Sequence, residues 1–177
     1  MSLTGYYLKA NAKFEIFEKY FAVAVITAIV VIVFAGTVSR YALKEPLFGV
    51  DRLATYLMVW LGFIGFQIAT SKLRHVEIEF IKAKVKPKTK YLMNIVTCFL
   101  ASVFLFIICL LSYEYMQISK EMNDIDVVLG IPIWWIILIV PLSFLLSAIR
   151  YAFSSLLWYD VYSGRRQEEE IVQKQMI

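Results

Sequence analysis

Side chains that could carry out chemistry are few in this sequence and lie far apart. The only histidine is His75, and the two cysteines, Cys98 and Cys109, are eleven residues apart. A zinc site needs several His, Cys or carboxylate ligands, which this set does not supply. On one helix the two thiols would lie about 16 Å apart along the axis, too far for a disulfide. The sequence therefore predicts no metal site, no cofactor and no enzymatic activity.

Asp51 and Arg52 are adjacent charged residues that could be imagined as a reactive pair. They directly precede a long apolar stretch, so we interpret them as an interfacial charge pair beside a helix start. The two cysteines lie inside another apolar stretch, where a thiol is an ordinary small packing group.

The elements that must position these residues are apolar and long. Hydrophobic residues make up 60% of the chain and charged residues only 18%, whereas soluble domains have about 45–50% and about 25%. Four windows without charge cover residues 20–39, 53–71, 91–113 and 127–149. A hydrocarbon core of about 30 Å needs about 20 helical residues. Because lipid offers the backbone no hydrogen bonds, each window must be a helix. The pattern predicts an all-α membrane protein with four transmembrane helices in one domain, residues 20–155.

The distribution of Lys and Arg predicts the orientation of the chain. Fourteen of them lie before the first window, between the second and third, or after the fourth, and four lie in the other two loops. Basic residues favour the cytoplasmic side, so both termini should be cytoplasmic. The third loop is acidic, and the net charge of +4 reflects topology rather than nucleic-acid binding.

Three polar regions flank the predicted spans. Residues 1–19 mix aromatic and charged side chains, with Tyr7, Phe14 and Phe17 near one helical face, which predicts an amphipathic helix in the cytoplasmic interface. Residues 156–177 are expected to form a cytoplasmic tail. A basic run should lie against anionic phospholipid headgroups; it comprises Lys82, Lys84, Lys86, Lys88 and Lys90.

The spans themselves carry stripes of small residues instead of charges. No ionisable side chain lies inside the windows, and the most polar residue there is Gln67. Membrane helices associate through small residues that allow close backbone approach. On the second span the stripe comprises Thr55, Met58, Gly62, Gly65 and Ala69, with Trp60 on the opposite face. Further stripes comprise Ala24, Ala28, Val31 and Ala35, and Cys98, Ala101, Ser102, Leu105, Cys109 and Ser112. These stripes could hold the four helices together or offer a face to a partner, and they favour a subunit over an autonomous machine.

Several short motifs resemble one known family in order and spacing. They are Ser39-Arg40-Tyr41, Glu45-Pro46-Leu47, Val59-Trp60-Leu61-Gly62-Phe63-Ile64-Gly65, Arg74-His75-Val76-Glu77-Ile78 and Gly130-Ile131-Pro132-Ile133-Trp134, followed by Pro141 and Arg150. Over residues 15–155 the chain resembles the small membrane subunit of tripartite ATP-independent periplasmic (TRAP) transporters, closest to the sialic-acid type. It departs from the family before the second span, where a tryptophan is absent and Arg52 stands where an acid is usual.

The resemblance implies a non-catalytic scaffold subunit in a bacterial inner membrane. Such a subunit forms a heterodimer with a large membrane subunit, which carries the sodium and substrate sites for uptake of an organic acid such as sialic acid or a C4-dicarboxylate. A periplasmic binding protein docks transiently. Residues expected at the subunit interface or in structural roles are Arg40, Tyr41, Trp60, Gly62, Gly65, His75, Pro132, Trp134 and Pro141. The alternatives are an autonomous homo-oligomeric transporter or channel, and a small membrane thiol oxidoreductase.

Overall fold

The computed structural model describes residues 3–45, 47–71 and 87–164 of the chain. Its helices are α1 (Leu3–Val38), the π-helix η1 (Ser39–Leu43), α2 (Val50–Ser71), α4 (Pro87–Glu121), α5 (Ile133–Ile137) and α6 (Ile139–Tyr162). Four stretches are long and apolar enough to cross a membrane, namely Asn11–Leu43, Val50–Ser71, Lys88–Glu121 and Ile133–Tyr162. This confirms the predicted all-α fold with four spans.

Two of the helices are much longer than the charge-free windows within them. Helix α1 has 36 residues and α4 has 35, which correspond to more than about 50 Å each. A hydrocarbon core is only about 30 Å thick, so both helices extend beyond it. Helix α1 runs without interruption from Leu3, in the segment expected in the interface, to Val38, one residue before the first window ends. The location of residues 1–19 in the membrane interface stays a prediction.

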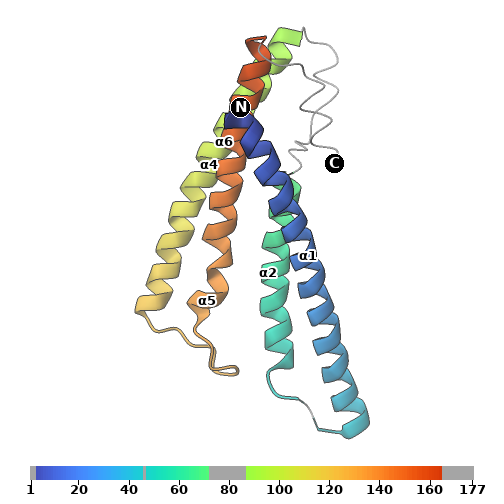
Figure 1. Cartoon of the computed structure of the whole chain (residues 1–177). Helices are drawn as coiled ribbons and strands as arrows, with labels where there is room; N and C mark the ends of the chain where they lie inside the picture. The colour runs from blue at the N-terminus through green and yellow to red at the C-terminus, as the bar shows by residue number, and fades with distance from the viewer. Residues whose placement is uncertain (1–2, 46, 72–86, 165–177) are drawn as a thin grey trace.

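The helices are arranged as two pairs (Figure 1). Helix α1 packs along α2, and α4 packs along α6, while the two pairs contact each other mainly through α2 and α6. The pairs lie close together at the end where α1 begins and α6 finishes, which we call the terminal end. They diverge toward the opposite end, the loop end, which holds the connections after η1 and after α4.

Each pair has its own apolar core. Between α1 and α2 the buried cluster is Val25, Ile29 and Ile64, with Trp60 packed against it. Between α4 and α6 the cluster consists of Cys98, Leu157, Trp158 and Val161. The two clusters do not merge into one core. The pairs do meet through apolar contacts of Phe144 on α6 with Phe63 and Phe66 on α2, whose ring centroids lie 5.8 Å from that of Phe144. Polar contacts add to this packing.

The third-span stripe holds α4 against α6. Cys98, Leu105 and Cys109 are buried. Ser102 donates a hydrogen bond from Oγ to the carbonyl of Ala148 at 2.9 Å. This stripe therefore serves packing within the chain. The first-span stripe behaves differently, because Ala24, Val31 and Ala35 are exposed and a neighbouring face of α1 contacts α2.

A break separates α5 from α6 beside Pro141. Proline has no N–H, so it cannot donate to the carbonyl of Ile137 four residues earlier. Helix α5 ends at Ile137 and α6 begins at Ile139. Pro141 is buried, and its own carbonyl accepts a hydrogen bond from Cys109 Sγ at 3.4 Å. The sequence placed Pro141 near the middle of a span, and the break lies within one turn of it.

Candidate functional site

Arg150 on α6 is the centre of a buried polar cluster at the terminal half of the bundle. We call the cluster the polar junction; it comprises Asn11, Glu18, Gln67, Thr70, Ser143, Ser147 and Arg150. Arg150 Nη2 lies 2.8 Å from Glu18 Oε2, and the two side chains are only 4% and 5% exposed. Arg150 Nη1 donates to the carbonyl of Gln67 at 2.5 Å. One guanidinium group thus contacts α1, α2 and α6.

Helix α1 surrounds this guanidinium with three residues of one face. Asn11, Phe14 and Glu18 are spaced by three and four residues, so they lie along one side of the helix. Arg150 Nε donates to Asn11 Oδ1 at 3.1 Å, and the ring centroid of Phe14 lies 5.7 Å from the guanidinium carbon. The aromatic ring and the two polar groups fix both the charge and the plane of Arg150.

Helices α2 and α6 are joined by matching polar pairs next to Arg150. Gln67 Nε2 donates to Ser143 Oγ at 2.7 Å, and the hydroxyls of Thr70 and Ser147 lie 3.2 Å apart. The partners advance by three residues on α2 and four on α6, which is one helical turn on each. Small serines let the two backbones approach closely, as is common between membrane helices.

The polar junction links the two helix pairs directly, whereas each apolar core lies within one pair. A charge inside a membrane protein is costly unless it is paired, and Arg150 and Glu18 neutralise each other only when α1 and α6 are side by side. The junction therefore makes one arrangement of the two helix pairs more favourable than the alternatives. Glu18 Oε1 is buried without a hydrogen-bond partner among the described residues, so the pairing of this carboxylate there is through Oε2.

A second polar contact links the pairs at the loop end. Asp126, in the connection between α4 and α5, accepts a hydrogen bond from the Tyr56 hydroxyl of α2. Its other oxygen accepts from the backbone N–H groups of Val128 and Leu129 at 2.9 and 2.8 Å. Leu129 in turn lies against Gly49, where an added Cβ would be 2.6 Å from Leu129 Cδ2 and φ is +81°. We call this contact the loop latch.

The loop latch has a predictable pH dependence. The hydrogen bonds from Tyr56 and from the N–H groups of Leu129 and Val128 hold the pKa of Asp126 below its ordinary value. A carboxyl group with a lowered folded pKa stabilises the fold above its unfolded pKa and loses that contribution as the pH falls through the folded pKa. With an ordinary aspartate pKa of about 3.9, we expect the latch to persist at neutral and weakly acidic pH and to open below about pH 4.

Hydrogen–deuterium exchange of residues 122–132 measures this opening, once protection is corrected for the intrinsic exchange rate at each pH. Tyr56→Phe should lower protection of this segment at pH 7 part of the way toward the level that wild type reaches in acid, because Asp126 keeps its bonds to Val128 and Leu129. Tyr41→Phe is the matched control, because Tyr41 is 78% exposed. Equal protection in Tyr56→Phe and wild type at pH 7 would show that the latch does not hold the loop.

The predicted stripe of α2 is exposed along its whole length. It consists of Thr55, Met58, Gly62, Gly65 and Ala69, all of them exposed. A Cβ added to Gly62 or Gly65 would meet no atom within 4 Å. The opposite face of the same helix carries Trp60 and Ile64, which pack toward α1. Helix α2 thus uses one face inside the chain and leaves its smallest face uncovered.

The other predicted residues are scattered rather than gathered into one site. Arg40 forms an exposed ion pair with Asp51 at 3.1 Å, and Tyr41 is exposed beside it in η1. Pro132 directly precedes α5, and the Trp134 ring lies 5.4 Å from Lys120 Nζ. His75 and three of the predicted headgroup lysines, Lys82, Lys84 and Lys86, lie outside the described residues. Lys88 is exposed and Lys90 half-buried near the start of α4.

The ion pair at the centre of the polar junction was missed by the sequence reasoning. Charged residues bound the windows and so lie outside them: Arg150 directly follows the fourth window, and Glu18 lies two residues before the first. One signal was present: both residues belong to the same predicted side of the membrane and carry opposite charges. Gln67, recognised as the most polar residue within a span, does belong to the junction.

The apolar helices and the internally paired charges define the class of protein, a helical membrane protein that crosses the bilayer several times. Residues 29–159 match the family described as tripartite ATP-independent periplasmic transporters, DctQ component, and the chain belongs to this family. The family is a transporter component, not an enzyme, as the sequence predicted.

Two curated relatives are similar over most of this chain. The ectoine TRAP transporter small permease protein TeaB of Halomonas elongata is 28% identical over 122 residues, which cover 69% of this chain and 63% of TeaB. The sialic acid TRAP transporter permease protein SiaT of Haemophilus influenzae is 27% identical over 134 residues, 76% of this chain but 21% of SiaT. The chain therefore spans less than two thirds of the length of either relative.

Proposed function

We propose that the chain is the small, non-catalytic subunit of a TRAP transporter and braces a large membrane subunit in a heterodimer. The observation that carries this proposal is the uncovered face of α2. The face that contains Gly62 and Gly65 is exposed, while other residues of α2 contact α1 and α6. Two outward-facing glycines allow a neighbouring helix to approach the backbone closely, which is how membrane helices associate.

Rigidity is the second requirement of a brace, and two contacts supply it. The polar junction fixes the two helix pairs at the terminal end, and the loop latch fixes them at the loop end. Both contacts join residues that are more than 60 positions apart in the chain. A subunit whose helix pairs are joined at both ends of the bundle can stay rigid while a partner subunit moves, and it need not transport substrate itself.

The chemistry of transport then belongs to the partner. We propose sodium-coupled uptake of an organic acid of the sialic acid or C4-dicarboxylate type, with transient docking of a periplasmic binding protein. The charges of the polar junction are paired with one another, which leaves them poorly suited to carry an ion along a path. This favours the subunit over an autonomous homo-oligomeric transporter or channel. Both thiols form contacts within the α4–α6 pair, which disfavours a thiol oxidoreductase.

The orientation proposed is with both termini in the cytoplasm of a bacterium and the loop end outside its inner membrane. It is supported by the excess of Lys and Arg in the sequence before the first window, between the second and third windows and after the fourth. Lysines 82 to 90 would then meet anionic headgroups of the inner leaflet. A cysteine introduced at Val127, which is 97% exposed, should react in intact spheroplasts with a reagent that does not cross membranes. Labelling only after lysis would show that the loop end lies in the cytoplasm and would contradict this orientation.

The test of the function is co-purification. The chain is expressed with a tag together with a large TRAP membrane subunit from the same organism, solubilised in mild detergent and captured. The proposal expects the large subunit to elute with the chain in a constant ratio through size-exclusion chromatography. Recovery of the tagged chain alone, under conditions where the large subunit is folded and abundant, would contradict it.

A further inference from the structure

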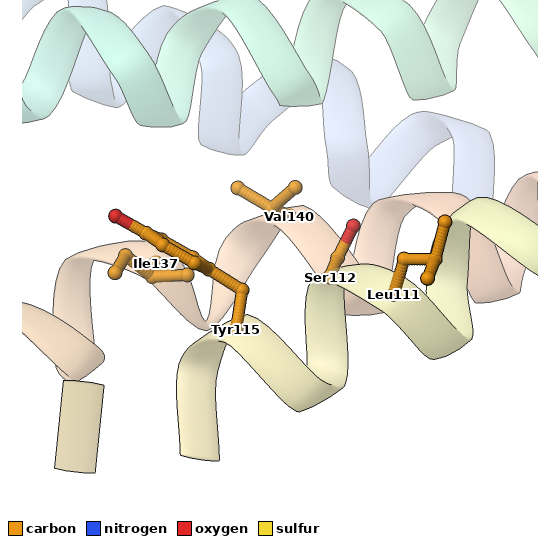
Figure 2. Close-up of a pocket in the computed structure, with 5 residues that line it drawn as sticks. All are labelled: Leu111, Ser112, Tyr115, Ile137 and Val140. Carbon is orange, nitrogen blue, oxygen red and sulfur yellow. The ribbon is translucent and has the colours of Figure 1, made fainter. Parts of the chain in front are cut away.

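An apolar groove runs between α4 and the α5–α6 segment, next to the break in that segment (Figure 2). It has a volume of about 370 Å³ and is lined by Leu111, Ser112, Tyr115, Ile137 and Val140. This volume falls within the range of about 300–1,000 Å³ that is typical of ligand sites. The groove belongs neither to the polar junction nor to the exposed face of α2.

The groove lies within the membrane-spanning stretches and leads toward the loop end. All five lining residues belong to the spans Lys88–Glu121 and Ile133–Tyr162. Trp134 and Trp135, one turn from Ile137, are the kind of side chain that marks the headgroup level. From Tyr115 to Leu111 the helix descends about 6 Å along its axis, away from the loop end. The groove thus begins near the headgroups and continues among the acyl chains.

One cation lies farther toward the loop end than the groove, on α4 five residues beyond Tyr115. Lys120 is the only Lys or Arg between residues 91 and 149, and it lies over the ring of Trp134. The exposed charged residues nearest to Lys120 in the sequence are all acidic: Glu114, Glu121 and Asp124. A phosphate beside Lys120 would have carboxylates within its surroundings, which disfavours a lipid with net negative charge and favours one with an ammonium group.

We propose that the groove binds one zwitterionic phospholipid of the phosphatidylethanolamine type. An acyl chain lies along Tyr115, Ile137 and Val140, the phosphate pairs with Lys120, and the ammonium group meets the surrounding carboxylates. The acyl chain packs closely against apolar side chains on both of its sides. The charged headgroup fixes the position of the lipid along the groove.

Native mass spectrometry of the full chain in mild detergent tests this site with phosphatidylethanolamine and phosphatidylglycerol as probes. Val140→Trp should fill the groove and lower the fraction with bound phosphatidylethanolamine about tenfold. Val103→Trp is the matched control, because Val103 is exposed on α4 and does not line the groove. Lys120→Gln, a surface change that leaves the packing intact, should lower the fraction about fivefold. Thermal unfolding checks that each variant is folded.

Three outcomes would overturn the proposal. Equal binding in wild type, Val140→Trp and Val103→Trp would show that lipid adheres elsewhere. Retention of phosphatidylglycerol equal to that of phosphatidylethanolamine would show that the ammonium group plays no part in binding. Loss of the lipid from the chain when the large subunit is bound, with Val140→Trp also blocking that subunit, would make the groove a docking site for a helix of the partner. Selective retention of phosphatidylethanolamine that both Val140→Trp and Lys120→Gln reduce would support it.

Discussion

Arg150→Met is expected to lower the free energy of unfolding by about 3–5 kcal/mol. The substitution leaves the Glu18 carboxylate buried between helices without its cation. It also removes one donor to the carbonyl of Gln67, which keeps the hydrogen bond from Thr70 Oγ1. A buried charge that has lost its partner is costly. Unfolding in mixed micelles, followed by tryptophan fluorescence or by steric trapping, measures the change.

Two further variants separate the charge from the packing. In Glu18→Leu combined with Arg150→Met both charges are replaced by apolar groups of similar size, so we expect more than half of the lost stability to return. Arg40→Met is the matched control, because the Arg40–Asp51 pair has side chains that are 55% and 85% exposed. An exposed pair contributes about 0–1 kcal/mol. If Arg150→Met and Arg40→Met cost the same, the polar junction does not hold the helix pairs together.

Gly65→Leu is expected to abolish most of the recovery of the large subunit while leaving this chain folded. The new side chain would extend into open space on the isolated chain, since a Cβ at this position meets nothing within 4 Å. In the heterodimer the same side chain would hold the neighbouring helix away from the α2 backbone, and close approach is the main source of helix association in lipid. A loss of at least 2 kcal/mol corresponds to about a thirtyfold weaker association.

The controls for Gly65→Leu test whether the exposed face of α2, rather than another surface of the chain, binds the large subunit. Ala69→Leu enlarges the same exposed face and should weaken recovery too, whereas Ala152→Leu places the same side chain on an exposed position of α6. Trp60→Ala tests a different contact, because Trp60 packs against the cluster between α1 and α2 and its loss should destabilise the chain itself. Full recovery of the large subunit with both Gly65→Leu and Ala69→Leu would place the interface elsewhere.

Much of the fold could be predicted from the sequence because the membrane imposes a simple rule. Four charge-free windows of about 20 residues can only be helices, and the structure contains four such spans. The true ends of the helices could not be predicted in this way. Helices α1 and α4 continue past their windows because a charged residue ends a hydropathy window but does not end a helix, as Glu18 in α1 illustrates.

The pairing of the helices was the part that sequence patterns left open. Small-residue stripes occur on three spans, but only the stripe of α4 faces another helix of this chain. On α1 and α2 a bulkier apolar face does this work instead, through Val25, Ile29 and Ile64. A stripe marks a surface on which close approach is possible, and only the arrangement of all helices tells which stripes are already used.

The polar junction and the exposed face of α2 together relate this structure to its proposed role. Arg150 holds α1 and α2 against α6, which fixes the direction in which α2 presents Gly62 and Gly65. Weakening the junction should therefore reduce binding of the large subunit even though no junction residue lies on the exposed face.

Uptake into proteoliposomes tests most directly whether the chain is a brace without transport of its own. Vesicles that contain the chain alone, the large subunit alone, or both are supplied with the cognate binding protein, a sodium gradient and labelled sialic acid or C4-dicarboxylate. We predict uptake of one solute only when both membrane subunits are present, and none with the chain alone. Uptake by the chain alone would contradict the proposed role.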